Sequence, residues 1–261
     1  MRTFIKAAIW TGAAVLSVLL SVLVFLPAAW LAPLAESATN GRITLGDAQG
    51  SLWRGSAFVG AAPSGKDAVM QLLPGRFNWR ITPLVLIGQV DARLENPQVL
   101  SEPVSIRGNW HEWAITASSM ALPAERLAAL GAPLNTLQPS GKLRLSWAHL
   151  TLAQQAGGVD CYGDMMLDML AMTTRLTPLT PLGSYRVKLD WQGRRAGMTL
   201  QTLDGALVLA GNGSIDQDHF QFSGTAQAAA GQEETLAGLL GFLGQPRWVD
   251  GKKIIGLEFK S

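Results

Sequence analysis

The stretch YRVKLDW, residues 185–191, decides the fold class of this 261-residue chain, because apolar and polar side chains alternate along all of it. The apolar residues are Tyr185, Val187, Leu189 and Trp191, and the polar residues between them are Arg186, Lys188 and Asp190. Successive side chains of a β-strand point to opposite faces, so this pattern gives one apolar face and one polar face. The stretch predicts a strand that is buried on one side and exposed to water on the other.

The same alternation recurs in other parts of the chain. It is clear in Lys142–Trp147 and in Ile255–Phe259, and it is weaker in Val90–Leu94. The methionine-rich segment Asp164–Met172 fits both the strand period and the helix period, and we predict it as a strand. The chain is therefore predicted to be mainly β.

Turn signals stand between these runs, at Gln49-Gly50, Asp204-Gly205 and Asn212-Gly213. The last two dipeptides can supply the positive φ that tight hairpins require. Strands joined by tight hairpins pair antiparallel. We therefore expect an antiparallel, curved sheet or an open-barrel-like domain.

Two short segments favour a helix. Pro123–Leu130 begins with a proline, which suits a first helical position, and Gly131 follows its last leucine. The second segment has leucines spaced at i, i+3, i+4 and i+7, which is typical of one helix face, and Gly244 ends it. These leucines are Leu236, Leu239, Leu240 and Leu243.

The N-terminal region predicts a membrane anchor. Ala7–Leu26 is an uncharged apolar run that follows Arg2 and Lys6, and as a helix it would span roughly 30 Å, the thickness of a bilayer core. A cleaved secretory signal is the alternative, but its small-residue site would be Ala35-Glu36-Ser37, well beyond the usual position. We therefore predict a cytoplasmic tip and anchor over 1–35 and a β-rich domain over 36–261.

The early basic charges also predict the orientation of the chain. An excess of Lys and Arg before a span keeps that end in the cytoplasm, so everything after Glu36 is expected to cross the membrane. Trp10 and Trp30 then stand near the two interfaces.

Composition argues against nucleic acid as a partner. Two of the 21 Lys and Arg residues, Arg2 and Lys6, precede the anchor, which leaves 19 cations against 19 Asp and Glu in the rest of the chain. Without a net basic field, counterion release offers little affinity for nucleic acid. The single cysteine, Cys161, cannot form an intrachain disulfide, so core packing must stabilise the domain.

We identify no catalytic, cofactor-binding or metal-binding residues in the sequence. His111, His149 and His219 stand apart, and Cys161 lacks the second cysteine of a redox or metal motif. We interpret the histidines as surface or hydrogen-bonded residues and the cysteine as a small core or edge residue. No cofactor and no small-molecule substrate are expected.

Tryptophans and methionines suggest core packing more than a ligand groove. Large rings usually occupy core positions, and flexible thioethers usually fill irregular cores. The tryptophans that follow the anchor are Trp53, Trp79, Trp110, Trp113, Trp147, Trp191 and Trp248, and the clustered methionines are Met165, Met166, Met169 and Met172.

The chain resembles the type II secretion system protein N family, also called general secretion pathway protein N. The first matching segment is GRITLGDAQGSLWRGSA at 41–57. The others, in order, are NWRITPLVLIGQV at 78–90, LPAERLAALGAPLNTLQPSGKLRLSW at 122–147, PLGSYRVKL at 181–189, LDGALVLAGNG at 203–213 and LAGLLGFLG at 236–244. Their order and spacing make the resemblance specific over nearly the whole chain.

This resemblance implies a single-pass inner-membrane protein of Gram-negative bacteria with a periplasmic β-rich domain. It would be a non-enzymatic component of the machine that exports folded proteins across the outer membrane. The partners implied are other components of that machine, notably protein C and also the secretin. Two alternatives stay open: a membrane-tethered carrier of lipid or another hydrophobic ligand, and an enzyme. A continuous apolar groove would favour the carrier, and titratable residues converging in a cleft would favour the enzyme.

Overall fold

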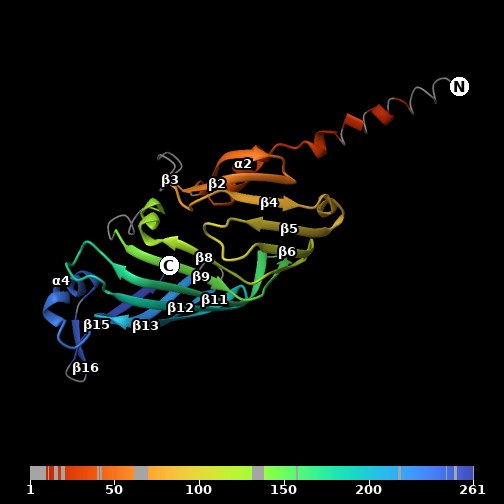
Figure 1. Cartoon of the computed structure of the whole chain (residues 1–261). Coiled ribbons are helices and arrows are strands. Elements are labelled where there is room, and N and C mark those ends of the chain that lie inside the picture. The colour runs from red at the N-terminus through yellow and green to blue at the C-terminus, as the bar shows by residue number, and fades with distance from the viewer. Residues whose placement is uncertain are drawn as a thin grey trace.

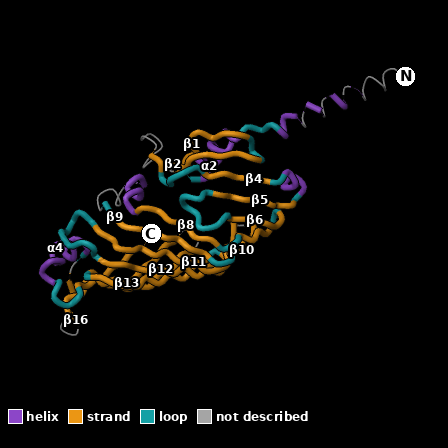
Figure 2. The backbone as a smooth tube through the Cα atoms, viewed as in Figure 1, coloured by secondary structure: helices purple, strands orange, loops and turns teal. Residues whose placement is uncertain are grey.

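The computed structural model of the chain describes residues 10, 12–14, 17–18, 21–39, 41, 43–61, 70–130, 138–156, 158–216, 219–244, 246–249 and 252–260. Within these residues, 17 strands form one curved antiparallel sheet, and short helices lie at its ends and edges (Figures 1 and 2). The prediction of a mainly β, antiparallel fold is confirmed.

The first eight strands build the part of the sheet nearer the N-terminus. They are β1 (Ile43–Gly50), β2 (Arg54–Ala61), β3 (Met70–Gln71), β4 (Phe77–Ile81), β5 (Gln89–Glu95), β6 (Val104–Asn109), β7 (Glu112–Ile115) and β8 (Ser118–Pro123). The remaining strands are β9 (Ser140–Trp147), β10 (Leu150–Gln155), β11 (Gly158–Thr173), β12 (Gly183–Gly193), β13 (Arg195–Gly205), β14 (Leu207–Asp216), β15 (His219–Ala228), β16 (Pro246–Val249) and β17 (Lys252–Lys260). The helices are η1 (Ala28–Trp30), α2 (Leu31–Ala38), η2 (Pro83–Ile87), η3 (Ala124–Leu130) and α4 (Glu233–Leu243).

The 16-residue strand β11 joins the two parts of the sheet. On one side it pairs with β12, which starts a meander through β13, β14 and β15. On its other side it pairs with β10 over its first residues and with β9 over its last residues. From β10 the sheet continues through β7, β6, β5, β4 and β2 to β1, while β9 pairs with β8. At the far end β15 pairs with β17, and β17 with β16, so β1 and β16 are the terminal strands of an open sheet.

Cross-strand register gives the sheet one apolar face and one polar face. Trp147, Met165, Leu189, Met198 and Gly213 stand opposite one another on β9 and β11–β14 and therefore share the face that we call the inner face. The residues next to them along each strand point to the opposite, outer face. Lys188, Asp190 and Asn212 are exposed there, whereas Ser146 and Met166 are half-buried. The alternation predicted for residues 185–191 thus sets the two sides of β12.

Two hydrophobic clusters cover parts of the inner face. One holds the apolar stripe of α4, with Leu236, Leu239 and Leu240, packed with Phe222 and Ile255 of β15 and β17. The other lies under β2, β4 and β6 and comprises Ala61, Leu72, Leu73, Phe77, Val99, Leu100 and Val104. The predicted helix face of Leu236, Leu239, Leu240 and Leu243 is confirmed, and the strand prediction for Asp164–Met172 is confirmed within β11.

One predicted turn is wrong. Gln49-Gly50 ends β1 at a hairpin, and Gly205 has a φ of 127° between β13 and β14, as expected. Asn212-Gly213, in contrast, lies inside β14 and pairs with β13 on one side and β15 on the other. The glycine is needed there for space, because an added Cβ at Gly213 would lie 2.6 Å from the carbonyl oxygen of Gln221 and 2.8 Å from Cε of Met198.

The helix predicted over Pro123–Leu130 begins one residue later than expected. Pro123 is the last residue of β8, and the 3₁₀-helix η3 follows over Ala124–Leu130. Arg126 of η3 donates from Nη1 to the carbonyl oxygen of Gln71 at 2.7 Å, and Glu125 accepts from the backbone N–H of Gly141. The short helix thus fastens β9 to the neighbourhood of β3.

The prediction that the tryptophans are core residues holds only in part. Trp53 is buried, whereas Trp79, Trp113, Trp147 and Trp191 are half-buried. Trp110 is 54% exposed, so its placement in the core was wrong: it sits in the turn after β6, beyond the region where the two faces are packed. The side chain of Trp248 lies outside the described residues.

The predicted anchor, Ala7–Leu26, lies partly outside the described residues, which include its positions 10, 12–14, 17–18 and 21–26. Among the residues that are described, no helix is both long enough and apolar enough to cross a membrane.

Candidate functional site

The loop of the β1–β2 hairpin contacts the C-terminal end of the predicted anchor and the residue that follows it. Trp53 donates from Nε1 to the carbonyl oxygen of Leu23 at 2.7 Å, and the backbone N–H of Leu52 donates to that of Leu26 at 2.8 Å. Pro27 and Ser51 form an isolated antiparallel bridge beside these bonds. The sheet is therefore attached directly to the N-terminal segment, and we call this contact the junction.

The strand next to the hairpin supports the junction from behind. Trp79 of β4 donates from Nε1 to the carbonyl oxygen of Leu52 at 3.0 Å, and the backbone N–H of Ile81 donates to that of Trp53 at 2.8 Å. Gly55 makes room for the Trp79 ring, because an added Cβ would lie 2.5 Å from Cζ2 of that ring. Trp53 in the loop and Trp79 on β4 thus fix the loop that holds the N-terminal segment.

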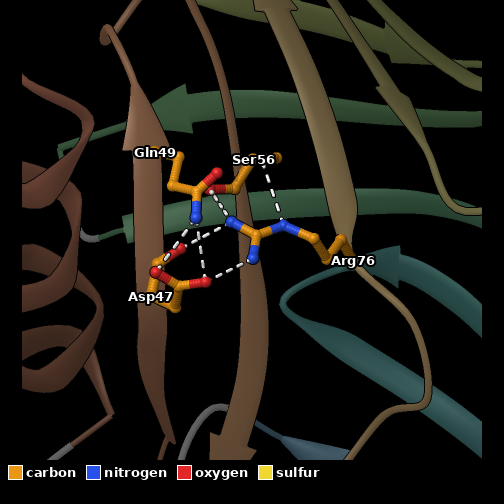
Figure 3. A network of polar contacts seen from close by, with 4 residues as sticks. All are labelled: Asp47, Gln49, Ser56 and Arg76. Atoms are coloured by element: carbon orange, nitrogen blue, oxygen red, sulfur yellow. Dashed lines mark hydrogen bonds and ion pairs between the residues drawn. The ribbon is translucent and has the colours of Figure 1, made fainter.

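Arg76 organises a polar network on the outer side of the same hairpin (Figure 3). Its Nη1 lies 2.5 Å from Oδ2 of Asp47, and its Nη2 donates to the Asp47 carbonyl oxygen at 2.6 Å. Its Nε donates to Oγ of Ser56 at 3.2 Å, and Gln49 donates from Nε2 to both carboxylate oxygens of Asp47. The guanidinium also stands 4.6 Å from the centre of the Phe58 ring.

The network stabilises an irregular point in β1. The register of β1 against β2 shifts between Gly46 and Gln49, and Asp47 in this bulge has a φ of 48°, which is unusual for a non-glycine residue. Hydrogen bonds from Arg76 and then Gln49 to the carboxylate lower the pKa of Asp47. The bonds hold Asp47 in its charged form and hold the bulge in place.

A cavity of about 930 Å³ extends across β9 and β11–β14. Its lining contains the row of Trp147, Met165, Leu189, Met198 and Gly213 together with neighbours of these residues along each strand. Three of those neighbours carry charge and are exposed: Asp164, Lys188 and Asp190. Asp164 and Asp190 stand directly opposite each other on β11 and β12. Residues next to each other along a strand point to opposite faces, so the side chains of the apolar row and of these charged neighbours lie on different sides of the sheet.

The titratable residues singled out in the sequence do not come together. His111 and His149 are exposed in connections between strands, His219 is exposed at the start of β15, and Cys161 is half-buried on β11. Burial raises the pKa of the Cys161 thiol, which disfavours the reactive thiolate. Within the described ranges, no group of three or more His, Cys, Asp or Glu residues is placed to hold a metal ion.

Sequence reasoning missed the Arg76 network and the junction. Arg76 and Asp47 are separated by a hairpin and by residues outside the described ranges, and only the pairing of β2 with both β1 and β4 brings them together. The tryptophan N–H bonds carry no sequence signal of their own, because their acceptors are backbone carbonyl groups.

Comparison with known proteins gives a match to one protein family. The family model for protein N of the type II secretion system matches residues 41–252, which include every strand from β1 to β16. Searches of curated proteins and of solved structures gave no match. Since the match covers most of the chain and nearly all of the sheet, this protein belongs to the type II secretion system protein N family.

Proposed function

We propose that this protein is an inner-membrane-anchored component of the type II secretion system that holds its β-sheet in the periplasm and acts by binding other components. The observation that carries the proposal is the family match over residues 41–252, because it spans the sheet itself. A family assignment to a secretion machine favours a binding role over catalysis for the surface that the sheet presents.

The exposed N-terminal residues support the anchoring. Large apolar side chains are exposed along the described part of this segment, where a soluble domain would bury them. They are Trp10, Val18, Val22, Val24, Phe25, Trp30 and Leu34. Arg2 and Lys6 before them favour a cytoplasmic N-terminus and a periplasmic sheet.

The cavity across β9 and β11–β14 is the surface that we propose for partner binding, with protein C as the first candidate and the secretin as the second. A hollow of about 930 Å³ can accept several side chains of a partner. Binding energy at such surfaces concentrates in a few residues seated in pockets, with charged groups at the rim fixing register. Lys188 and Asp190, both exposed in the lining, are the charged groups that would do so.

A secretion assay in a deletion strain tests the proposal. Without the protein, exoproteins should accumulate in the periplasm, and the full-length chain should restore their export. The paired reversal Lys188→Glu and Asp190→Lys should reduce export at unchanged protein level on immunoblots. The variants His111→Ala, His149→Ala, His219→Ala and Cys161→Ser should export like the wild type. If a stable His or Cys variant exported as little as the deletion strain, the result would contradict the binding role and indicate an active site.

The carrier alternative has one observation in its favour. Leu145, Leu167 and Val187 on the inner face are half-buried and belong to neither hydrophobic cluster, so some apolar surface between the clusters is accessible. If the deletion leaves export intact and changes the lipid composition of the outer membrane, the result supports the carrier function and contradicts the role in secretion.

A further inference from the structure

An exposed apolar patch lies next to the junction. η2 connects β4 to β5, and its Leu84, Leu86 and Ile87 are 42%, 47% and 77% exposed. Trp110, in the turn between β6 and β7, is also exposed and donates from Nε1 to the carbonyl oxygen of Val85 at 2.6 Å. We call Leu84, Leu86, Ile87 and Trp110 the apolar tip.

Hydrogen bonds connect the tip to the N-terminal segment through a single tryptophan. Ile81, two residues before η2, donates its backbone N–H to the carbonyl oxygen of Trp53, and the Trp53 indole donates to the carbonyl oxygen of Leu23. Figure 1 accordingly shows the helical turn between β4 and β5 at the end of the sheet from which the N-terminal segment leaves. The exposed ring of Phe25 stands in that segment, so two apolar surfaces share one end of the molecule.

A row of arginines crosses the outer face just behind the tip. Arg54 of β2 stands directly opposite Arg80 of β4, and Arg80 stands directly opposite Arg93 of β5. Like charges placed opposite one another destabilise a sheet, so the row costs stability in the isolated protein. Arg93 has an ion pair with Glu95 at 2.6 Å, whereas no ion pair of Arg54 or Arg80 occurs among the described residues. The row therefore keeps an excess of positive charge.

The arginine row borders a small polar cavity. Its volume is about 320 Å³, and its lining consists of Asn78, Trp79, Arg80, Arg93 and Glu95. Arg80, Arg93 and Asn78 bring hydrogen-bond donors to this lining, and the Glu95 carboxylate, which is paired with Arg93, brings one negative charge. Two guanidinium groups against one carboxylate leave a net positive charge, and guanidinium donors suit the oxygens of a phosphate group.

We infer that the apolar tip and the arginine row form a second contact with the membrane, in which the tip enters the interface and Arg80 and Arg93 bind phosphates of anionic phospholipids. This inference rests on the proposed anchoring. Arg80 precedes Pro83 by three residues, which is about 10 Å along an extended chain and comparable with the depth of the headgroup region. Tryptophan belongs at such an interface, and a weak apolar contact joined to basic charge gives stable surface binding.

Fluorescence quenching in vesicles tests the contact with the full-length chain. Ile87→Cys in a Cys161→Ser background accepts an environment-sensitive dye, and the protein is reconstituted in phosphatidylglycerol–phosphatidylethanolamine vesicles that contain spin-labelled lipid. The dye at position 87 should lose roughly half of its emission to the quencher, as expected for a side chain in the interface. Leu203→Cys, at an exposed apolar position on β13, is the matched control and should stay unquenched.

Substitution of the arginines tests the phosphate contact. Quenching of the dye at position 87 measures the ratio of protein with the tip in the membrane to protein with the tip outside it. Arg80→Gln and Arg93→Gln should each lower this ratio about five-fold in anionic vesicles and leave it unchanged in phosphatidylcholine vesicles. Arg195→Gln, on the outer face away from the tip, should have no effect in either. Unchanged quenching in the Arg80 and Arg93 variants would overturn the phosphate contact.

A third label separates this inference from the proposed anchoring. Phe25→Cys places the dye in the N-terminal segment itself. If that dye is quenched while the dye at position 87 behaves like the one at position 203, the anchor stands and the tip contact is refuted. If neither is quenched, the anchoring proposal has failed and the tip contact fails with it.

Discussion

Nη1 of Arg76 lies 2.5 Å from Oδ2 of Asp47, and this pair closes the bulge of β1 against the loop that leads into β4. The Arg76 hydrogen bond is the main reason that the pKa of Asp47 is lower in the folded chain than its ordinary value of 3.8. The unfolded chain therefore takes up a proton first as the pH falls, so the pair's contribution to stability is present above about pH 4 and lost as the pH falls through the folded pKa.

Asp47→Asn should consequently destabilise the protein near pH 7 and have progressively less effect below pH 4. Urea midpoints of the full-length protein in detergent micelles, followed by tryptophan fluorescence across this range, measure the difference. Glu95→Gln, which removes the partner of a more exposed pair, serves as the control. If the wild type keeps the same excess in urea midpoint over Asp47→Asn below pH 4 as at pH 7, the role given to the Asp47 charge is contradicted.

Leu236→Ala should destabilise the domain by about 2–5 kcal/mol, because the side chain is fully buried at the centre of the α4 cluster. Leu203→Ala removes the same atoms from an exposed position and should change the free energy of unfolding by less than about 0.5 kcal/mol. Equal effects of the two substitutions in urea unfolding would show that α4 is not packed on the sheet.

Gly213→Ala should destabilise the sheet by about 1–3 kcal/mol, because its Cβ would meet the backbone of β15 and the tip of Met198. Gly197→Ala on the adjacent strand is the matched control, since an added Cβ there has no neighbour within 4 Å. Thermal unfolding of both variants checks the assignment of Asn212-Gly213 to the interior of β14. A tolerated Gly213→Ala would restore the hairpin interpretation.

Trp147→Phe and Trp191→Phe should differ although both rings are half-buried. Trp147 donates from Nε1 to the carbonyl oxygen of Thr116 at 3.0 Å, so its replacement should cost about 1 kcal/mol. The Nε1 of Trp191 is buried without a hydrogen-bond partner among the described residues, so its removal should be neutral or stabilising. A loss for Trp191→Phe as large as that for Trp147→Phe would mean that this indole has a bound acceptor.

Local periodicity was sufficient to predict the strands and the helix α4. The buried face of a strand or helix can be read from a few residues that are close in sequence. The alternation in residues 185–191 and the leucine spacing of 236–243 show this directly. The antiparallel pairing could also be predicted locally, because two strands joined by a short turn can pair only antiparallel.

Features that depend on register or on distant neighbours could not be predicted. Asn212-Gly213 has the composition of a hairpin turn. Its glycine is required instead because an added Cβ would lie against Phe222 and Met198, which belong to the two neighbouring strands. Pro83–Ile87 has the apolar composition of a strand and forms a 3₁₀-helix. The arginine row appears only when β2, β4 and β5 are aligned, because Arg54, Arg80 and Arg93 have no common spacing along the chain.

The pairing order of the strands has a consequence for how the protein folds. From β11 to β15 each strand pairs with the next, so this region can assemble one hairpin at a time with short loops to close. The β7–β10 ladder differs, because it joins Ile115 to Leu150 across the whole excursion of β8, η3 and β9. Closing that long loop is the slow step we expect, and until it is complete the two halves of the sheet would behave as separate folding units.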